Sequence, residues 1–121
     1  MNLTIKTTDA ISGVGAKILL GTTTSLAAIA EQLAPVEQAH FNSLSGKGIS
    51  TLEFYRENGP LIVHLTKYQE SDHISIEKCR REGFDFLDRL KKLQIRAVGI
   101  QSFCPWPNTL GFVEGMALGS Y

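Results

Sequence analysis

The sequence predicts a single α/β domain in which helices flank a mixed, mostly parallel β-sheet. Apolar strand-like runs alternate with amphipathic helical patterns in the second half of the chain, which is typical of parallel pairing. A turn around Asn58-Gly59-Pro60 separates two further strand-like runs and predicts antiparallel pairing there. The length of 121 residues suits one domain, and contents of 43% hydrophobic and 20% charged residues are those of a globular protein.

The chain begins with two strand-like segments, Leu3–Thr8 and Ala16–Leu20. A helix follows, because apolar residues recur at the spacing of one helical face, and either Thr24 or Ser25 can cap its start. The apolar residues of that face are Leu26, Ile29, Ala30 and Leu33. Pro35 is expected to close the helix.

The middle of the chain contains the strongest strand signal. The segment Val36–Ser45 has two interpretations, a short helix or an irregular link, and the turn Gly46-Lys47-Gly48 follows it. Next come Ser50–Arg56 and Leu61–Lys67, which read as a hairpin or as two neighbouring strands. Both faces of the second run are mostly apolar, which predicts a central strand covered on both sides.

The clearest helix spans Ser75–Leu93, where an apolar stripe faces one side and charged residues face the other. The stripe consists of Ile76, Cys79, Gly83, Phe86, Leu87 and Leu90. The opposite charges spaced by four are Glu77/Arg81, Lys78/Glu82, Asp85/Arg89 and Asp88/Lys92. A buried strand is predicted at Ile95–Gln101, then a loop at Cys104–Pro107, and Asn108 is predicted to cap the last helix.

The charge balance argues against several classes of partner. Twelve basic residues equal twelve acidic ones, and the basic residues of the long helix alternate with carboxylates, so we expect no nucleic-acid or anionic membrane surface. No apolar run approaches the ~20 residues that span a bilayer, and the first residues do not resemble a secretion signal. A cytoplasmic protein with free thiols at Cys79 and Cys104 is expected.

No arrangement of residues predicts a catalytic, metal or cofactor site in this chain. His40, His64 and His73 fall on three different predicted elements without metal-ligand spacing, so each is interpreted as a surface or hydrogen-bonded core histidine. Cys104 precedes Pro105 and lacks the signature of a nucleophilic cysteine. The Gly46-Lys47-Gly48 turn is not a Walker loop, and the GxG at 13–15 precedes a strand, so neither is expected to hold a phosphate.

The last helix carries Gly111, Gly115 and Gly119, three glycines spaced by four. Each costs about 1 kcal/mol of helix stability relative to alanine, so we expect another element to lie very close to this ridge of glycines. The modest apolar stripe beside the glycines consists of Leu110, Val113 and Ala117. Phe84 and Trp106 are read as edge-of-core residues, with contact anchors as the alternative.

The order of these features resembles the amino-terminal domain of cytosolic leucyl aminopeptidases. That domain ends in a small-residue helix with an EG..LG.Y pattern. The matching residues here are Glu114, Gly115, Leu118, Gly119 and Tyr121. The helical segment 78–83 (KCRREG) and Phe41 followed by Gly46-Lys47-Gly48 also look like regions of the family.

The resemblance implies a three-layer, macro-like domain that performs no chemistry and contributes to assembly of a homo-oligomer and to active-site access. A catalytic carboxy-terminal domain would follow in the same chain, bind two zinc or manganese ions and release amino-terminal residues from peptides. Its NTDAEGR signature does not occur here. Residues 1–121 are therefore expected to be a single non-catalytic domain that ends at a domain boundary.

Two alternatives remain open from the sequence. The first is a stand-alone macro-like module that binds a nucleotide or an ADP-ribose derivative, suggested by the fold class and the glycine turns. The second is a protein-interaction domain that uses Phe84, Trp106 or the glycine ridge.

Overall fold

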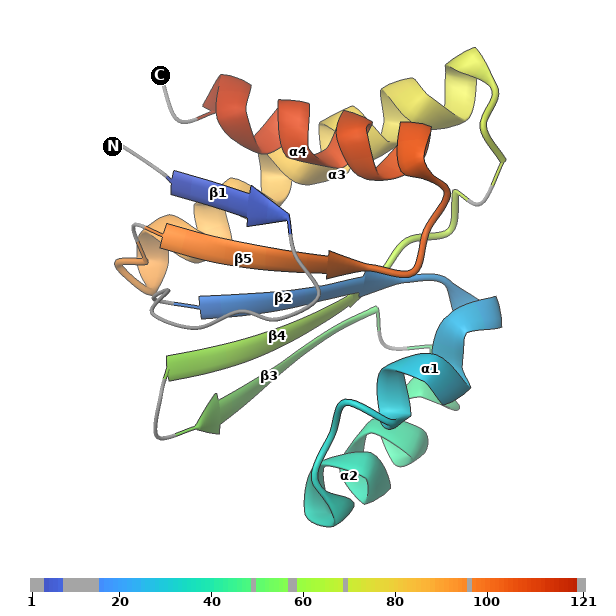
Figure 1. Cartoon of the computed structure of the whole chain (residues 1–121), viewed down its shortest axis with the longest axis vertical. Coiled ribbons are helices and arrows are strands. Elements are labelled where there is room, and N and C mark those ends of the chain that lie inside the picture. Colours follow the sequence, from blue (N-terminus) through green and yellow to red (C-terminus); the bar gives the residue numbers. More distant parts are fainter. Residues whose placement is uncertain are drawn as a thin grey trace.

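The structure, a computed structural model, describes residues 4–7, 16–48, 50–56, 59–68, 70–95 and 97–119. It is an α/β domain with helices on both sides of a five-stranded sheet (Figure 1). The strands are β1 (Thr4–Thr7), β2 (Ala16–Gly21), β3 (Thr51–Arg56), β4 (Gly59–Leu65) and β5 (Ala97–Ser102). The helices are the 3-10 helix η1 (Thr23–Ser25), α1 (Leu26–Ala30), α2 (Pro35–Ser45), α3 (His73–Lys92) and α4 (Trp106–Gly119). The GxG at 13–15 and Tyr121 lie outside the described residues.

The sheet is mixed and mostly parallel, as the sequence predicts. Its strand order is β1-β5-β2-β4-β3, with parallel pairing everywhere except between β3 and β4. Strand β2 lies at the centre, where Ile18 is opposite Ile62 of β4 and Ile100 of β5. Helix α3 connects β4 to β5 and so passes across β2, which is the crossover that parallel strands require.

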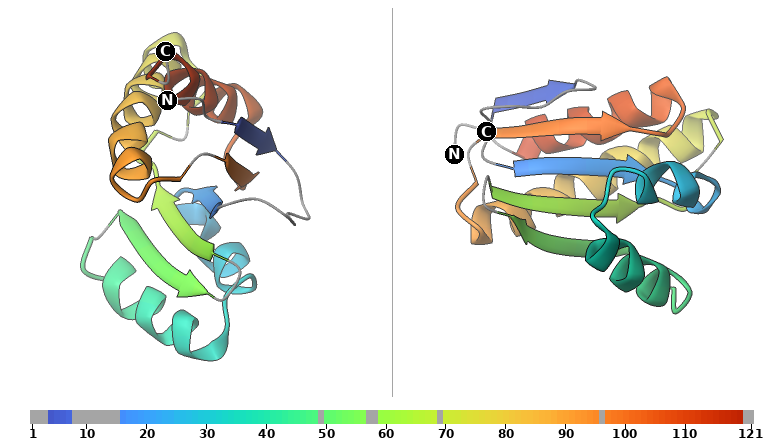
Figure 2. Two further views of the ribbon diagram at one scale, coloured as in Figure 1. Left: turned by 90° about the vertical axis from the view of Figure 1, so that its left-hand side faces the viewer. Right: turned by 60° about the horizontal axis from the view of Figure 1, so that its bottom comes forward.

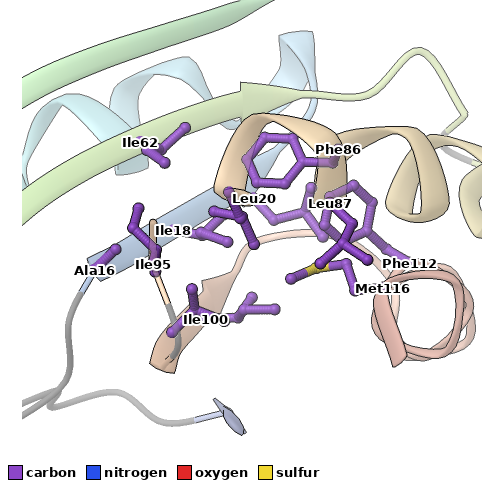
Figure 3. Close-up of a cluster of buried hydrophobic side chains, with 12 residues drawn as sticks. Ala16, Ile18, Leu20, Ile62, Phe86, Leu87, Ile95, Ile100, Phe112 and Met116 are labelled. Carbon is purple, nitrogen blue, oxygen red and sulfur yellow. The ribbon is translucent and has the colours of Figure 1, made fainter. Parts of the chain in front are cut away.

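Two hydrophobic cores lie on opposite faces of the sheet, because side chains alternate along each strand. On β2, Ile18 and Leu20 face one core and Leu19 faces the other, and none is more than 1% exposed. The first core joins β2, β4 and β5 to α3 and α4, whose Phe86, Leu87, Phe112 and Met116 point toward the strand residues (Figure 3). The second core joins β2, β3 and β4 to α1 and α2 on the other side of the sheet (Figure 2).

Helices α3 and α4 pack backbone against backbone through glycines. A Cβ atom added to Gly83 of α3 would lie 2.0 Å from the carbonyl oxygen of Phe112, and one added to Gly115 of α4 would lie 1.9 Å from that of Arg80. The other two glycines of the ridge also face α3, namely Gly111 against Ile76 and Gly119 against Leu87 and Phe84. The expected close neighbour of the glycine ridge is therefore α3.

The start of α4 differs from the prediction. The helix begins at Trp106, so the predicted loop is shorter, and Asn108 lies inside the first turn instead of capping it. Asn108 is 1% exposed, and its side-chain nitrogen donates to the carbonyl oxygens of Tyr68 at 3.0 Å and Glu70 at 2.8 Å. The Asn108 side chain therefore supplies hydrogen bonds to two backbone carbonyl groups of a neighbouring loop. Local sequence does not predict such a long-range role.

Pro35 begins a helix, whereas the sequence predicted that it closes one. Helix α1 ends at Ala30, and Pro35 is the first residue of α2, which settles the ambiguous segment as helical. Proline suits this position because its missing N–H would have no helical partner. The carboxylate of Glu37 accepts a hydrogen bond from Ala34 N at 2.9 Å and stabilises the same helix start.

Replacing Gly115 or Gly83 with alanine tests the helix contact. Each added methyl group would overlap a backbone carbonyl that cannot turn away, so α3 and α4 must separate. We expect each variant to lose about 2 kcal/mol or more of unfolding free energy, despite the better helix propensity of alanine. Urea denaturation followed by circular dichroism measures this loss.

Gly46→Ala provides the matched control. Gly46 lies at the end of α2 with φ −65°, and the nearest atom to an added Cβ would be 3.5 Å away. Its unfolding free energy should change by no more than about 0.5 kcal/mol. Equal losses at Gly46 and Gly115 would contradict the close-contact explanation.

Candidate functional site

A groove lies between α3 and the open face of the sheet at β3 and β4. Its volume is about 570 Å³, within the usual range of about 300–1,000 Å³ for small-molecule pockets. Thr51 of β3 and His64 of β4 lie in it, and Phe86 of α3 and Leu93, which directly follows α3, contribute apolar surface. Its charged residues are Glu53, Glu82, Asp85, Asp88, Arg89 and Lys92.

A hydrogen-bond network built around His64 forms one side of the groove. His64 Nδ1 lies 2.9 Å from Thr51 Oγ1, and His64 Nε2 lies 3.3 Å from Glu82 Oε1. The second carboxylate oxygen of Glu82 accepts a hydrogen bond of 2.5 Å from Thr66 Oγ1, which itself accepts from Tyr68 N at 3.2 Å. The network therefore connects β3, β4 and α3 through side chains that are far apart in the sequence.

Both ring nitrogens of His64 bond to side chains within the network. A neutral imidazole protonated at Nε2 satisfies both contacts, because Nδ1 then accepts from Thr51 while Nε2 donates to Glu82. The His64 ring is 8% exposed and lies 5.4 Å from the ring of Phe86 and 5.5 Å from that of Phe112. Hydroxyl, imidazole and carboxylate are also the residue types of a nucleophilic triad, in which both ring nitrogens are hydrogen-bonded in the same way. Here Glu82 also bonds to Thr66, and the imidazole packs against the two phenylalanine rings. We interpret the network as structural, because it holds β3, β4 and α3 together.

The sequence interpretation of His64 as a hydrogen-bonded core histidine is confirmed. His40 of α2 is exposed, with its ring 5.9 Å from that of Phe54, and His73 is the exposed first residue of α3. The three histidines thus stay on separate elements. The sequence analysis did not identify Glu82 as the partner of His64. Its position beside the apolar stripe of α3 could have indicated that its carboxylate faces inward.

The charged residues of α3 lie mostly on its solvent-exposed side, as predicted, and several of them form ion pairs with other elements. Glu82 turns inward to His64, and Arg89 pairs with Glu53 on β3. Arg80 reaches Glu114 of α4 at 2.9 Å and also pairs with Glu77, three residues away on its own helix. The ion pairs of α3 therefore join it mainly to β3, β4 and α4.

The described residues of the family-like motif lie on α4. Glu114 forms the ion pair with Arg80 on the outer side of the two helices, and Gly115 lies against the α3 backbone. Gly119 contacts α3 next to Phe84, and Leu118 is 58% exposed. Phe84 at 53% and Trp106 at 61% are two further exposed apolar side chains of the helix pair.

Both thiols are held in the neutral form. Burial raises the pKa of Cys104 to about 11 and also raises the pKa of Cys79. Asn108 Nδ2 lies 3.6 Å from the Cys79 sulfur. Since the thiolate is the reactive form, neither cysteine has the properties of a nucleophile.

Hydroxyl groups gather where β2 and β5 end, at the carboxyl edge of the sheet. Thr22 caps the short helix η1, Ser25 Oγ donates to the Phe103 carbonyl at 3.4 Å, and Ser102 Oγ lies 2.6 Å from Thr109 Oγ1. The chain leaves β2 toward one face of the sheet and leaves β4 and β5 toward the other, so this edge is a topological switch point.

Comparison with family models, curated proteins and solved structures finds no match for this chain. Among the described residues, no three His, Cys, Asp or Glu side chains lie close enough to hold a metal ion. Within the same ranges, no helix is both long and apolar enough to cross a membrane.

Thr66→Val tests the polar network. The substitution keeps the volume but removes the hydroxyl that serves both Glu82 and Tyr68 N, and Thr66 is only 2% exposed. We expect a loss of about 1–3 kcal/mol in unfolding free energy, measured by urea denaturation. Thr24→Val, at an exposed position in η1, should cost less, and an equal cost would contradict the role of the network.

The thiol pKa shifts predict slow labelling and a fall in stability at high pH. At pH 8, Ellman's reagent should react at least about a hundredfold more slowly with the native protein than in urea, with Cys104→Ser isolating Cys79. Because the folded pKa is raised, the contribution of the thiols to stability is full below their unfolded pKa of about 8.5 and is lost as the pH rises toward 11. Native labelling as fast as in urea would show that the thiols are not protected.

Proposed function

We propose that this chain is a non-catalytic domain that acts by packing against other protein, as the amino-terminal domain of a metal-dependent leucyl aminopeptidase. The observation that carries the proposal is the construction of α4. Its inner side fits the backbone of α3 through the glycines of the family-like motif, and its outer side presents Trp106, Leu110 and Leu118 to solvent. Apart from Glu114, the outer side of α4 is therefore largely apolar as well, which is typical of a helix that is covered on both sides.

The finer fold assignment belongs to the same proposal. A mixed, mostly parallel sheet with helices on both faces supports a three-layer, macro-like domain. The proposed parent protein is cytoplasmic and homo-oligomeric. Two zinc or manganese ions would be held by a catalytic domain in the same chain, and this domain would contribute to assembly and active-site access.

One observation favours a second candidate, a module that binds a nucleotide or ADP-ribose. The hydroxyl groups at the carboxyl edge lie at a topological switch point, where open α/β sheets bind ligands. Calorimetric titration with ADP-ribose distinguishes the two, because heat saturating at micromolar ligand would favour the nucleotide module.

Two measurements test the aminopeptidase proposal. The gene sequence after the codon for Tyr121 should encode a metallopeptidase domain containing the NTDAEGR signature. In that full-length protein, Trp106→Asp combined with Leu118→Asp should weaken assembly at least about tenfold, because charges would enter a buried apolar contact. Analytical ultracentrifugation measures the change.

Val36→Asp is the matched control, since Val36 is 83% exposed on α2, on the other face of the sheet. It should leave the assembly unchanged. A stop codon directly after Tyr121 would refute the two-domain proposal, and an unchanged assembly in the double variant would refute the packing role of α4.

A further inference from the structure

We propose that the groove beside β3 is a docking surface for an extended, basic segment of a partner protein, which adds as a strand to the free edge of β3. The inference does not depend on the proposed function. Within the described residues, β3 has β4 on one side and no strand on the other. An edge strand with unpaired backbone groups is a template for strand addition.

The hydrogen-bond register shows which residues face that edge. Leu65 N donates to Ser50 O at 2.7 Å, and hydrogen-bonded pairs alternate along an antiparallel ladder. Thr51, Glu53 and Tyr55 therefore direct their backbone N–H and C=O groups away from β4. Tyr55 lies opposite Pro60, which has no N–H to donate, so this pair is a non-hydrogen-bonded one, as the alternation requires.

The face of the sheet above β3 is also uncovered. The core under α3 and α4 contains residues of β2, β4 and β5 but, among the described residues, none of β3. Leu52 and Phe54 point to the other face, into the core of α1 and α2. Thr51 and Glu53 point into the groove, so alternate side chains of an added strand would lie beside the same space.

The charge of the groove specifies the kind of segment. Four carboxylates and only two cationic side chains, Arg89 and Lys92, line it. Arg89 is engaged by Glu53, whereas Asp85 and Asp88 are exposed and have no ion-pair partner among the described residues. A lysine or arginine on the added strand would meet these two carboxylates. The apolar surface of Phe86 and Leu93 suits the methylene stem of such a side chain.

An alternating lysine–valine hexapeptide, acetylated and amidated, is the probe. Titration of the full chain at physiological ionic strength should shift the amide NMR signals of Thr51, Glu53 and Tyr55 and those near Asp85 and Asp88. The Asp85→Asn/Asp88→Asn variant should weaken binding at least about tenfold. The matched variant Glu31→Gln/Glu70→Gln removes two exposed carboxylates elsewhere and should bind as the parent does.

Tyr55→Pro tests strand addition separately, because it removes an outward N–H without a ladder bond. It should abolish binding, whereas Tyr55→Ala should retain it. If Tyr55→Pro does not fold, a probe N-methylated at alternate valines replaces it and should not bind. Equal binding of a glutamate–valine hexapeptide, signal shifts outside the groove and β3, or unaltered binding by the Asp85→Asn/Asp88→Asn variant would each overturn the proposal.

Discussion

The contact between α3 and α4 is the constraint on which the rest of the structure depends. Ordinary helices pack with axes about 8–10 Å apart because side chains separate them. At Gly83 and Gly115 there is no room even for a Cβ atom, so the two backbones touch. This contact orients Phe86 and Phe112 toward the sheet together, where their rings lie 5.5 Å apart and close over His64.

The same contact explains why the groove exists. A sheet of five strands is about 19 Å wide, since neighbouring strands lie about 4.8 Å apart. Two helices in backbone contact span less width than two ordinary helices, and here they cover β2, β4 and β5. The face of β3 next to α3 is left open. Polar side chains on this boundary, among them Thr51, His64 and Glu82, bond to one another across the uncovered margin.

Features that depend on the local spacing of residues were predicted from the sequence. Features that depend on a partner far away in the sequence were not. The stripe of α3, the apolar strands β4 and β5, and the need for a neighbour at the glycine ridge all follow from residue spacing. The role of Asn108 does not, because its partners are loop carbonyls about 40 residues away in sequence. The ion-pair partners of Arg80 and Arg89 could not be predicted for the same reason, since Glu114 and Glu53 come from other elements. The groove could not be predicted, because its lining residues from β3, β4 and α3 meet only after folding.

Several polar side chains that could take part in chemistry are bonded to other groups of the protein. A group that moves a proton to or from a substrate needs a lone pair or a hydrogen directed at it. His64 and Thr66 direct theirs at neighbouring side chains and backbone, and burial keeps Cys104 protonated. The described groups that face solvent include the outer apolar side chains of α4 and the carboxylates beside β3. Exposed apolar side chains and unpaired carboxylates are groups that contribute burial and charge to contacts between proteins.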